Sequence, residues 1–115
     1  MVLCTPTFAA TVCKIGSKGY SSLQAAVDAV KDGQTITVTK AIKTSEMVCI
    51  ESPDTSITNF TIDFKNKKYT YSGYDYAFFL GGTKRTITFK NINFKVTRGV
   101  KIAGRGIQNL NILDI

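Results

Sequence analysis

The sequence predicts an all-β solenoid, in which one short N-terminal helix caps about three to four coils of stacked strands. Three observations support this prediction. Residues 20–38 show the pattern of an amphipathic helix that runs directly into a strand. The rest of the chain shows the short alternating apolar pattern of strands, broken by turn residues. The run Phe-Lys-Asn at residues 64–66 recurs at residues 89–91, and a recurring structural unit is typical of solenoids.

The chain is long enough for one domain with a modest core. It has 115 residues, of which 43% are hydrophobic, so its composition is that of a globular protein. No linker-like stretch divides it. We therefore expect a single β-helix domain over residues 11–115, with a cap at 11–34 and coils at 35–115. Residues 1–10 are predicted to be the remnant of a secretory leader or a disordered N-terminus.

The first ten residues indicate where the protein is located. The small residues around Phe8 resemble the end of a signal-peptide cleavage site, although the charged start of such a peptide is absent. We therefore expect a secreted or cell-surface protein. No stretch approaches the roughly 20 apolar residues that a membrane span needs, so no span is predicted.

The cap begins with an alternating strand at residues 11–15 and a turn at 16–19. Ser21 is the expected helix N-cap, and Gln24 stands three residues later, as in a capping box. Gly33 is expected to end the helix in a left-handed conformation. The apolar stripe of the helix consists of Leu23, Ala26, Val27 and Val30.

Strands are expected wherever apolar residues alternate or cluster between turn residues. The repeat then suggests how they align. Ile62 matches Ile87 at a spacing of 25 positions, and Asn91 matches Asn109 at a spacing of 18. The expected strands cover residues 35–39, 47–50, 69–71, 74–80, 86–89, 92–94 and 100–102, with a strand pair over 57–64, and apolar residues at 107, 110, 112 and 115 finish the chain.

Three asparagines fall at equivalent points of this alignment. In a parallel stack, asparagine side chains at a bend can hydrogen-bond to those above and below. Asn66, Asn91 and Asn109 are therefore predicted to form a structural ladder, and the alternative is three unrelated turn residues.

The motif at residues 20–38 resembles the N-terminal cap of the right-handed parallel β-helix superfamily, the pectate-lyase-like group. It contains the run Leu-Gln-Ala-Ala-Val-Asp-Ala-Val from residue 23, followed by Asp32, Gly33 and a Thr-Ile-Thr-Val strand. The resemblance implies a short right-handed parallel β-helix with a capping α-helix, and an extracellular protein that handles carbohydrate. The alternative fold is an antiparallel β-sandwich with one helix.

Residues suited to catalysis or metal binding are scarce. The chain has no histidine and only three cysteines, which removes the usual zinc sites and every triad that needs histidine. The eight acidic residues are not clustered, so we expect no catalytic residue, no metal site and no cofactor. Cys13 and Cys49 either pair or remain as two small buried thiols.

The charge balance points to an acidic partner. Fifteen Lys and Arg against eight Asp and Glu give a net charge of +7, which suits a polysaccharide or cell-wall polymer. Scattered lysines that keep strand edges soluble are the alternative explanation. Nucleic acid is not favoured, because no nucleic-acid-binding motif is present. The predicted ligand-binding residues are Tyr74, Tyr76, Lys65, Lys90 and Arg85.

The sequence therefore predicts a secreted or surface-displayed, non-catalytic module that binds carbohydrate or has a structural role. The alternative is the N-terminal fragment of a polysaccharide lyase or glycoside hydrolase whose catalytic coils lie beyond residue 115. The last coil has no visible cap, so self-association into a homo-oligomer through that coil is also expected.

Overall fold

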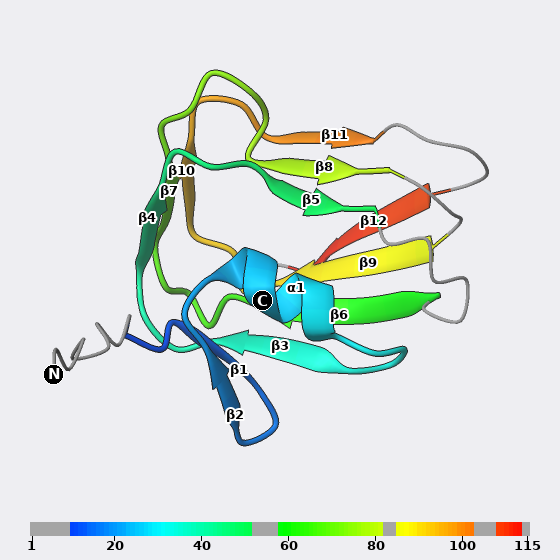
Figure 1. Cartoon of the computed structure of the whole chain (residues 1–115). Helices are drawn as coiled ribbons and strands as arrows, with labels where there is room; N and C mark the ends of the chain where they lie inside the picture. Colours follow the sequence, from blue (N-terminus) through cyan, green and yellow to red (C-terminus); the bar gives the residue numbers. More distant parts are fainter. Residues whose placement is uncertain (1–9, 52–57, 82–84, 103–107, 114–115) are drawn as a thin grey trace, which may run out of the picture.

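The computed structural model describes residues 10–51, 58–81, 85–102 and 108–113 (Figure 1). Most of the predicted leader, residues 1–9, lies outside this part of the chain. The described strands form three sheets. Sheet A contains, in spatial order, β12 (Gln108–Leu113), β9 (Arg85–Lys90), β6 (Asn59–Asp63), β3 (Thr35–Val38), β1 (Cys13–Ile15) and β2 (Lys18–Tyr20). Sheet B contains β10 (Phe94–Val96), β7 (Tyr69–Tyr71) and β4 (Ile42–Thr44), and sheet C contains β11 (Val100–Ile102), β8 (Phe78–Leu80) and β5 (Val48–Ile50).

The predicted parallel β-helix is wrong for this structure. The strands form three separate sheets, and sheet A is mixed because β1 pairs antiparallel with both β2 and β3. Within the described residues no closed or solenoid sheet is present. The resemblance to the pectate-lyase-like superfamily is therefore not supported, and it lends no support to a function. The antiparallel sandwich does not describe the molecule either, since the pairs in sheets B and C are parallel.

The physical reason for the wrong prediction is that a sequence repeat shows which segments are alike but does not show how their strands pair. A recurring apolar pattern shows that two segments share an environment, but the length of the turns between strands decides how the segments align. Phe60 lies opposite Ile87, 27 positions later, whereas Tyr69 lies opposite Phe94, only 25 positions later. The turn at 64–68 is therefore two residues longer than the turn that precedes Phe94. The predicted alignment of Ile62 with Ile87 is shifted by two positions, because Ile62 lies opposite Phe89.

The core lies between the three sheets and is rich in aromatic rings. Alternation along the strands sends every second side chain inward, as in β9, where Arg85, Ile87 and Phe89 are buried. Phe64 follows β6 and is fully buried near the centre of this cluster. Its ring contacts those of four other residues at centroid distances of 4.9 to 6.1 Å, namely Tyr69, Phe78, Phe89 and Phe94.

Helix α1 (Leu23–Ala29) lies in front of the sheets in Figure 1 and packs its apolar side on the core. Leu23, Ala26 and Val27 are buried, as the helical stripe predicts. The N-cap is Ser22, one residue later than predicted, and its Oγ accepts a hydrogen bond from the Ala25 amide at 3.1 Å. The helix ends before Val30, whose backbone is extended, so Gly33 lies in the turn beyond it.

Because the helix starts at Leu23, Gln24 is not part of a capping box and binds strand β5 instead. The Gln24 Oε1 accepts a hydrogen bond from the Cys49 amide at 2.7 Å, and its Nε2 donates to the Cys49 carbonyl at 3.0 Å. β5 is an edge strand of sheet C, so this side-chain amide replaces the neighbouring strand that Cys49 lacks. The Nε2 also donates to Asp28 within the helix.

Replacing Gln24 with alanine is expected to lower the free energy of unfolding by about 1–2 kcal/mol, because two half-buried backbone groups lose their partner. Hydrogen exchange should accelerate at the Cys49 amide, whereas the amides of β6 in the middle of sheet A should keep their protection. Gln24→Glu is a second comparison: it keeps the acceptor for the Cys49 amide, but it replaces the donor by a carboxylate oxygen that faces the Cys49 carbonyl and Asp28. An unchanged exchange rate at Cys49 in the alanine variant would show that the contact is not maintained in solution.

Candidate functional site

Two connecting segments lie side by side at the upper end of the molecule in Figure 1, and they carry exposed aromatic and basic residues. The first joins β7 to β8 at residues 72–77, and the second joins β10 to β11 at residues 97–99. Thr97 Oγ1 donates to the Gly73 carbonyl at 2.9 Å, and the Ala77 amide donates to the Arg98 carbonyl at 3.0 Å. These hydrogen bonds fix the position of one segment against the other.

Gly73 allows the first segment to approach the chain beneath it. A Cβ atom at this position would lie 2.6 Å from the Ser45 carbonyl oxygen and would also press on the Tyr71 ring. The segments at residues 45, 73 and 97 therefore stack closely, because the middle one has no side chain at the contact. This packing sets the place of Tyr74, the next residue along.

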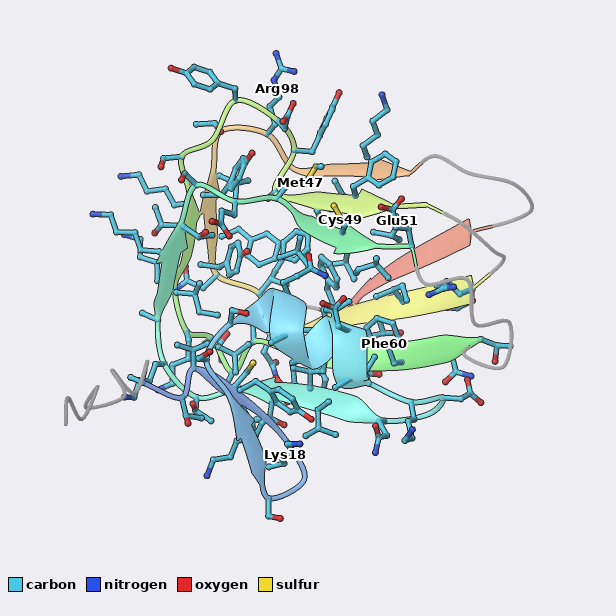
Figure 2. All side chains as sticks on the ribbon, in the orientation of Figure 1. Lys18, Met47, Cys49, Glu51, Phe60 and Arg98 are labelled. Atoms are coloured by element: carbon cyan, nitrogen blue, oxygen red, sulfur yellow. The ribbon has the colours of Figure 1, made fainter. Side chains whose placement is uncertain are left out.

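Tyr74 and Tyr76 form the aromatic part of the site. Tyr74 is 98% exposed, and Tyr76 is half-buried. The guanidinium carbon of Arg98 lies 5.7 Å from the centre of the Tyr76 ring, and the ammonium nitrogen of Lys101 lies 5.8 Å from it. Both distances are in the range of cation–π contacts. Figure 2 shows Arg98 at the outer end of the molecule, pointing away from the sheets.

The site combines positive charge with flat apolar surface. Arg98 and Lys101 are exposed, and Asp75, also exposed, is the acidic residue within the first segment. A tyrosine ring can lie flat against the apolar face of a sugar while its hydroxyl remains in water, and the two cations can pair with carboxylates. Among the described residues of these two segments Asp75 is the one carboxylate, whereas acid–base catalysis on a sugar needs a pair, so the arrangement is suited to binding.

The other predicted ligand residues lie elsewhere. Lys65 is exposed at the turn after β6, at the opposite end of β7 from Tyr74, and Lys90 lies opposite Asp63 in sheet A. Arg85 is only 2% exposed, so its guanidinium is not part of the surface. Tyr74 and Tyr76 share the segment between β7 and β8, whereas these three cations belong to other segments.

Asp63 has a structural role in the turn that holds Lys65. Its Oδ1 accepts hydrogen bonds from the Lys65 amide at 3.0 Å and from Asn91 Nδ2 at 2.9 Å, while the Lys65 ammonium lies 3.9 Å from Oδ2. Lys65 and Asn66 both have positive φ angles, which side chains disfavour and which a hydrogen-bonded aspartate helps to maintain.

The three asparagines of the predicted ladder do not occupy equivalent positions. The Asn66 amide donates to the Asn91 carbonyl at 2.9 Å, and both residues have positive φ, so these two lie at neighbouring turns. Asn109 lies within β12, opposite Thr86. The side-chain Nδ2 of Asn93 donates to the Asn66 backbone carbonyl at 3.2 Å, a contact that the sequence did not suggest.

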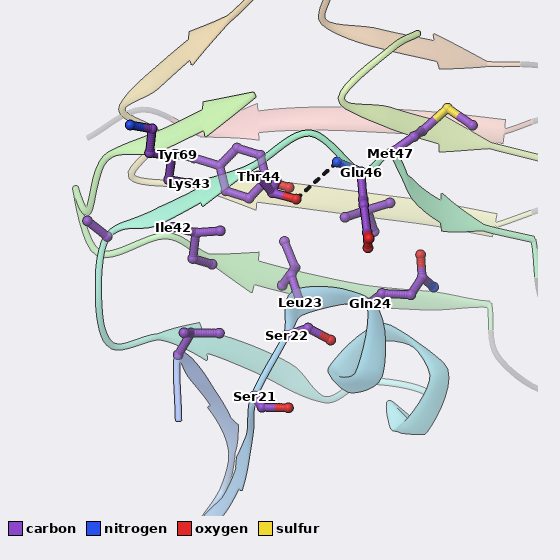
Figure 3. Close-up of a pocket in the computed structure, with 13 residues that line it drawn as sticks. Ser21, Ser22, Leu23, Gln24, Ile42, Lys43, Thr44, Glu46, Met47 and Tyr69 are labelled. Atoms are coloured by element: carbon purple, nitrogen blue, oxygen red, sulfur yellow. Dashed lines mark hydrogen bonds between the residues drawn. The ribbon is translucent and has the colours of Figure 1, made fainter. Parts of the chain in front are cut away.

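A groove of about 380 Å³ lies along the free edge of β4 (Figure 3). Its walls are the start of α1 and the chain between β4 and β5, including Leu23, Gln24, Lys43 and Glu46. The Glu46 amide donates to Thr44 Oγ1 at 3.0 Å, which orders this wall. Among the described residues that line the groove, Glu46 supplies the one carboxylate, and this lining shows no set of residues arranged for catalysis.

The two described thiols are unsuited to redox or nucleophilic chemistry. Cys13 is buried, Cys49 is half-buried, and both are free. Burial raises the pKa of the Cys13 thiol to about 11, and burial together with the charges of Glu51 and Asp28 also raises the pKa of Cys49. Both groups are thus mainly protonated at neutral pH, and a thiol is a poor nucleophile.

The described residues show no metal site and no membrane-spanning helix. Within the described ranges, no group of three or more His, Cys, Asp and Glu side chains is close enough to hold a metal ion. No described helix has the length and apolar character needed to cross a membrane.

Sequence reasoning missed the partners of Tyr76, because they follow from the register of sheet C, which the sequence does not show. In sheet C, Phe78 lies opposite Val100, 22 positions later. The same spacing places Arg98 beside Tyr76, but the repeat had suggested spacings of 25 and 18. Comparison with known proteins adds no further guide, because no protein-family model, no curated protein and no solved structure matches this chain.

Proposed function

We propose that this protein is a secreted or surface-displayed, non-catalytic module that binds an acidic polysaccharide. The observation that supports the proposal is the position of Arg98 and Lys101 beside the Tyr76 ring, next to the exposed Tyr74. The net charge of +7 favours an acidic ligand over a neutral one. The leader-like residues at the N-terminus support an extracellular location.

The ligand's carboxylates and its sugar rings would be bound by different groups. Each charged hydrogen bond to Arg98 or Lys101 contributes more than a neutral one, because charge-assisted bonds are about twice as strong. The tyrosines contribute by contact with the ring face and by excluding water. Loss of either kind of contact should therefore weaken binding without unfolding the protein, since Tyr74 and Arg98 are exposed.

Calorimetric titration with an oligouronate and with a neutral oligosaccharide of the same length tests the proposal. Tyr74→Ala and Arg98→Gln should each weaken binding of the oligouronate by about tenfold, which corresponds to about 1.4 kcal/mol. The neutral sugar should bind wild type more weakly than the oligouronate does.

Lys18→Gln is the matched control for Arg98→Gln. Lys18 lies 5.7 Å from the Tyr20 ring on the β1–β2 hairpin, so it forms a similar cation–aromatic contact away from the proposed site. This variant should bind the oligouronate as wild type does. Equal binding of acidic and neutral sugars, or equal losses in Lys18→Gln and Arg98→Gln, would overturn the proposal.

A further inference from the structure

The outward side of sheet B is a polar and basic face. Tyr69 and Tyr71 of β7 are buried, so Thr70 between them points outward, and the same alternation turns Lys43 of β4 and Lys95 of β10 outward. The register places Lys43 and Lys95 on either side of Thr70. With neighbouring strands about 4.8 Å apart, the Cα atoms of the two lysines are about 10 Å apart.

This row of three residues has polar rows before and after it. The Ile42 amide donates to the Lys68 carbonyl and the Tyr69 amide donates to the Asn93 carbonyl, so Lys68 lies between Ala41 and Asn93. In the same way, the backbone hydrogen bonds of Ser72 and Thr97 align these residues with Ser45. We call this surface the lysine face, and its functional groups come from Lys43, Lys68, Lys95, Thr70, Ser72 and Thr97.

The lysine face carries positive charge that nothing on it neutralises. Lys43, Lys68 and Lys95 are exposed. All nine outward positions of the three rows lie in the described part of the chain, and none is acidic. The nearest acidic residues along the chain, Glu46 and Asp75, come after the ends of β4 and β7.

The lysine face is continuous with the proposed site. Thr97 on its last row is followed directly by Arg98, and Ser72 is followed by the segment that carries Tyr74 and Tyr76. The hydrogen bond from Thr97 Oγ1 to the Gly73 carbonyl joins the two regions. A ligand bound at Tyr76 that extends along the strands of sheet B would therefore pass over the lysines.

We propose that the lysine face binds the continuing chain of a linear acidic polysaccharide, of which a short end is held by the tyrosines. This inference rests on the proposed function and adds the length and direction of the ligand to it. Charge complementarity supports the choice of occupant, because three unneutralised ammonium groups suit a polymer with a carboxylate on successive sugars. The hydroxyls of Thr70, Ser72 and Thr97 can bond to sugar hydroxyls between the charges.

The test compares a uronate trisaccharide with a longer oligomer of the same sugar. In wild type, the longer oligomer should bind at least tenfold more tightly, and its affinity should fall more steeply as NaCl rises from about 50 to about 200 mM. The double variant Lys43→Gln with Lys95→Gln should lose about tenfold in affinity for the long oligomer and have a shallower salt dependence. Its affinity for the trisaccharide should remain that of wild type.

The control variant carries Lys14→Gln and Lys31→Gln, which remove the same charge from β1 and from the chain after α1, where both lysines are exposed. Equal losses in the two double variants would show that only net charge matters and would overturn the inference. If the long oligomer binds no more tightly than the trisaccharide, the inference is overturned but the proposed function is not. If neither sugar binds, both proposals are overturned. A polynucleotide that displaces the long oligomer with higher affinity would show that the occupant is nucleic acid.

Discussion

Replacing Phe64 with alanine is expected to lower the free energy of unfolding by about 3–5 kcal/mol, a large share of the stability of a domain of this size. Phe64 is fully buried, and its ring contacts Tyr69, Phe78, Phe89 and Phe94. These four rings come from strands or adjoining segments of all three sheets, so a cavity at Phe64 removes contacts that hold the sheets together.

The measurement is urea-induced unfolding followed by circular dichroism. Phe79→Ala is the matched control, because Phe79 stands in the middle of β8 but points outward and is only half-buried. Phe79→Ala should lower the free energy of unfolding by about 1 kcal/mol or less. Phe64→Leu, which keeps most of the side-chain volume, should lower the free energy of unfolding less than Phe64→Ala does. Similar midpoints for the alanine variants at positions 64 and 79 would contradict the central place of Phe64.

The second large effect is expected at Gly73, where alanine should destabilise the fold by about 1–3 kcal/mol. The added methyl group would lie 2.6 Å from the Ser45 carbonyl oxygen, so either the β7–β8 segment or the chain beneath it must shift. Because this segment carries Tyr74 and Tyr76, the shift should also weaken binding of the oligouronate.

Gly99→Ala provides the comparison within the same site. Gly99 lies in the neighbouring segment, and a Cβ atom there would meet nothing within 4 Å. This variant should keep its stability to within about 0.5 kcal/mol, as surface substitutions usually do. Thermal unfolding of the two variants tests this prediction. If Gly73→Ala is as stable as Gly99→Ala, the close approach to Ser45 is absent in solution.

Local patterns in the sequence predicted individual elements well. The apolar stripe identified α1, and alternation identified strands such as β3 and β9, because side-chain periodicity follows directly from backbone geometry. The helix start was misplaced by one residue, since Ser21 and Ser22 are chemically alike and only packing decides which of them is the cap.

The arrangement of the strands was not predictable in the same way. The antiparallel pairing of β1 with β3 depends on how the first residues fold back, and the alignment of later strands depends on turn lengths that the repeat does not reveal. For the same reason Asn109 was assigned to a turn although it lies within β12. Tyr74 and Tyr76 were named from the sequence as ligand-binding residues, but Arg98 and Lys101 joined Tyr76 only once the register of sheet C was known.

The hydrogen bonds between Gln24 and Cys49 have a consequence for the protein at high concentration. A bare strand edge can recruit strands from other molecules and begin a fibril, and natural proteins cover such edges. In this protein the cover of β5 is one amide on a seven-residue helix, which has little stability of its own. Local opening of α1 would therefore expose the edge of β5 in addition to the edge of β4, so the tendency of the protein to aggregate depends in part on the stability of this helix.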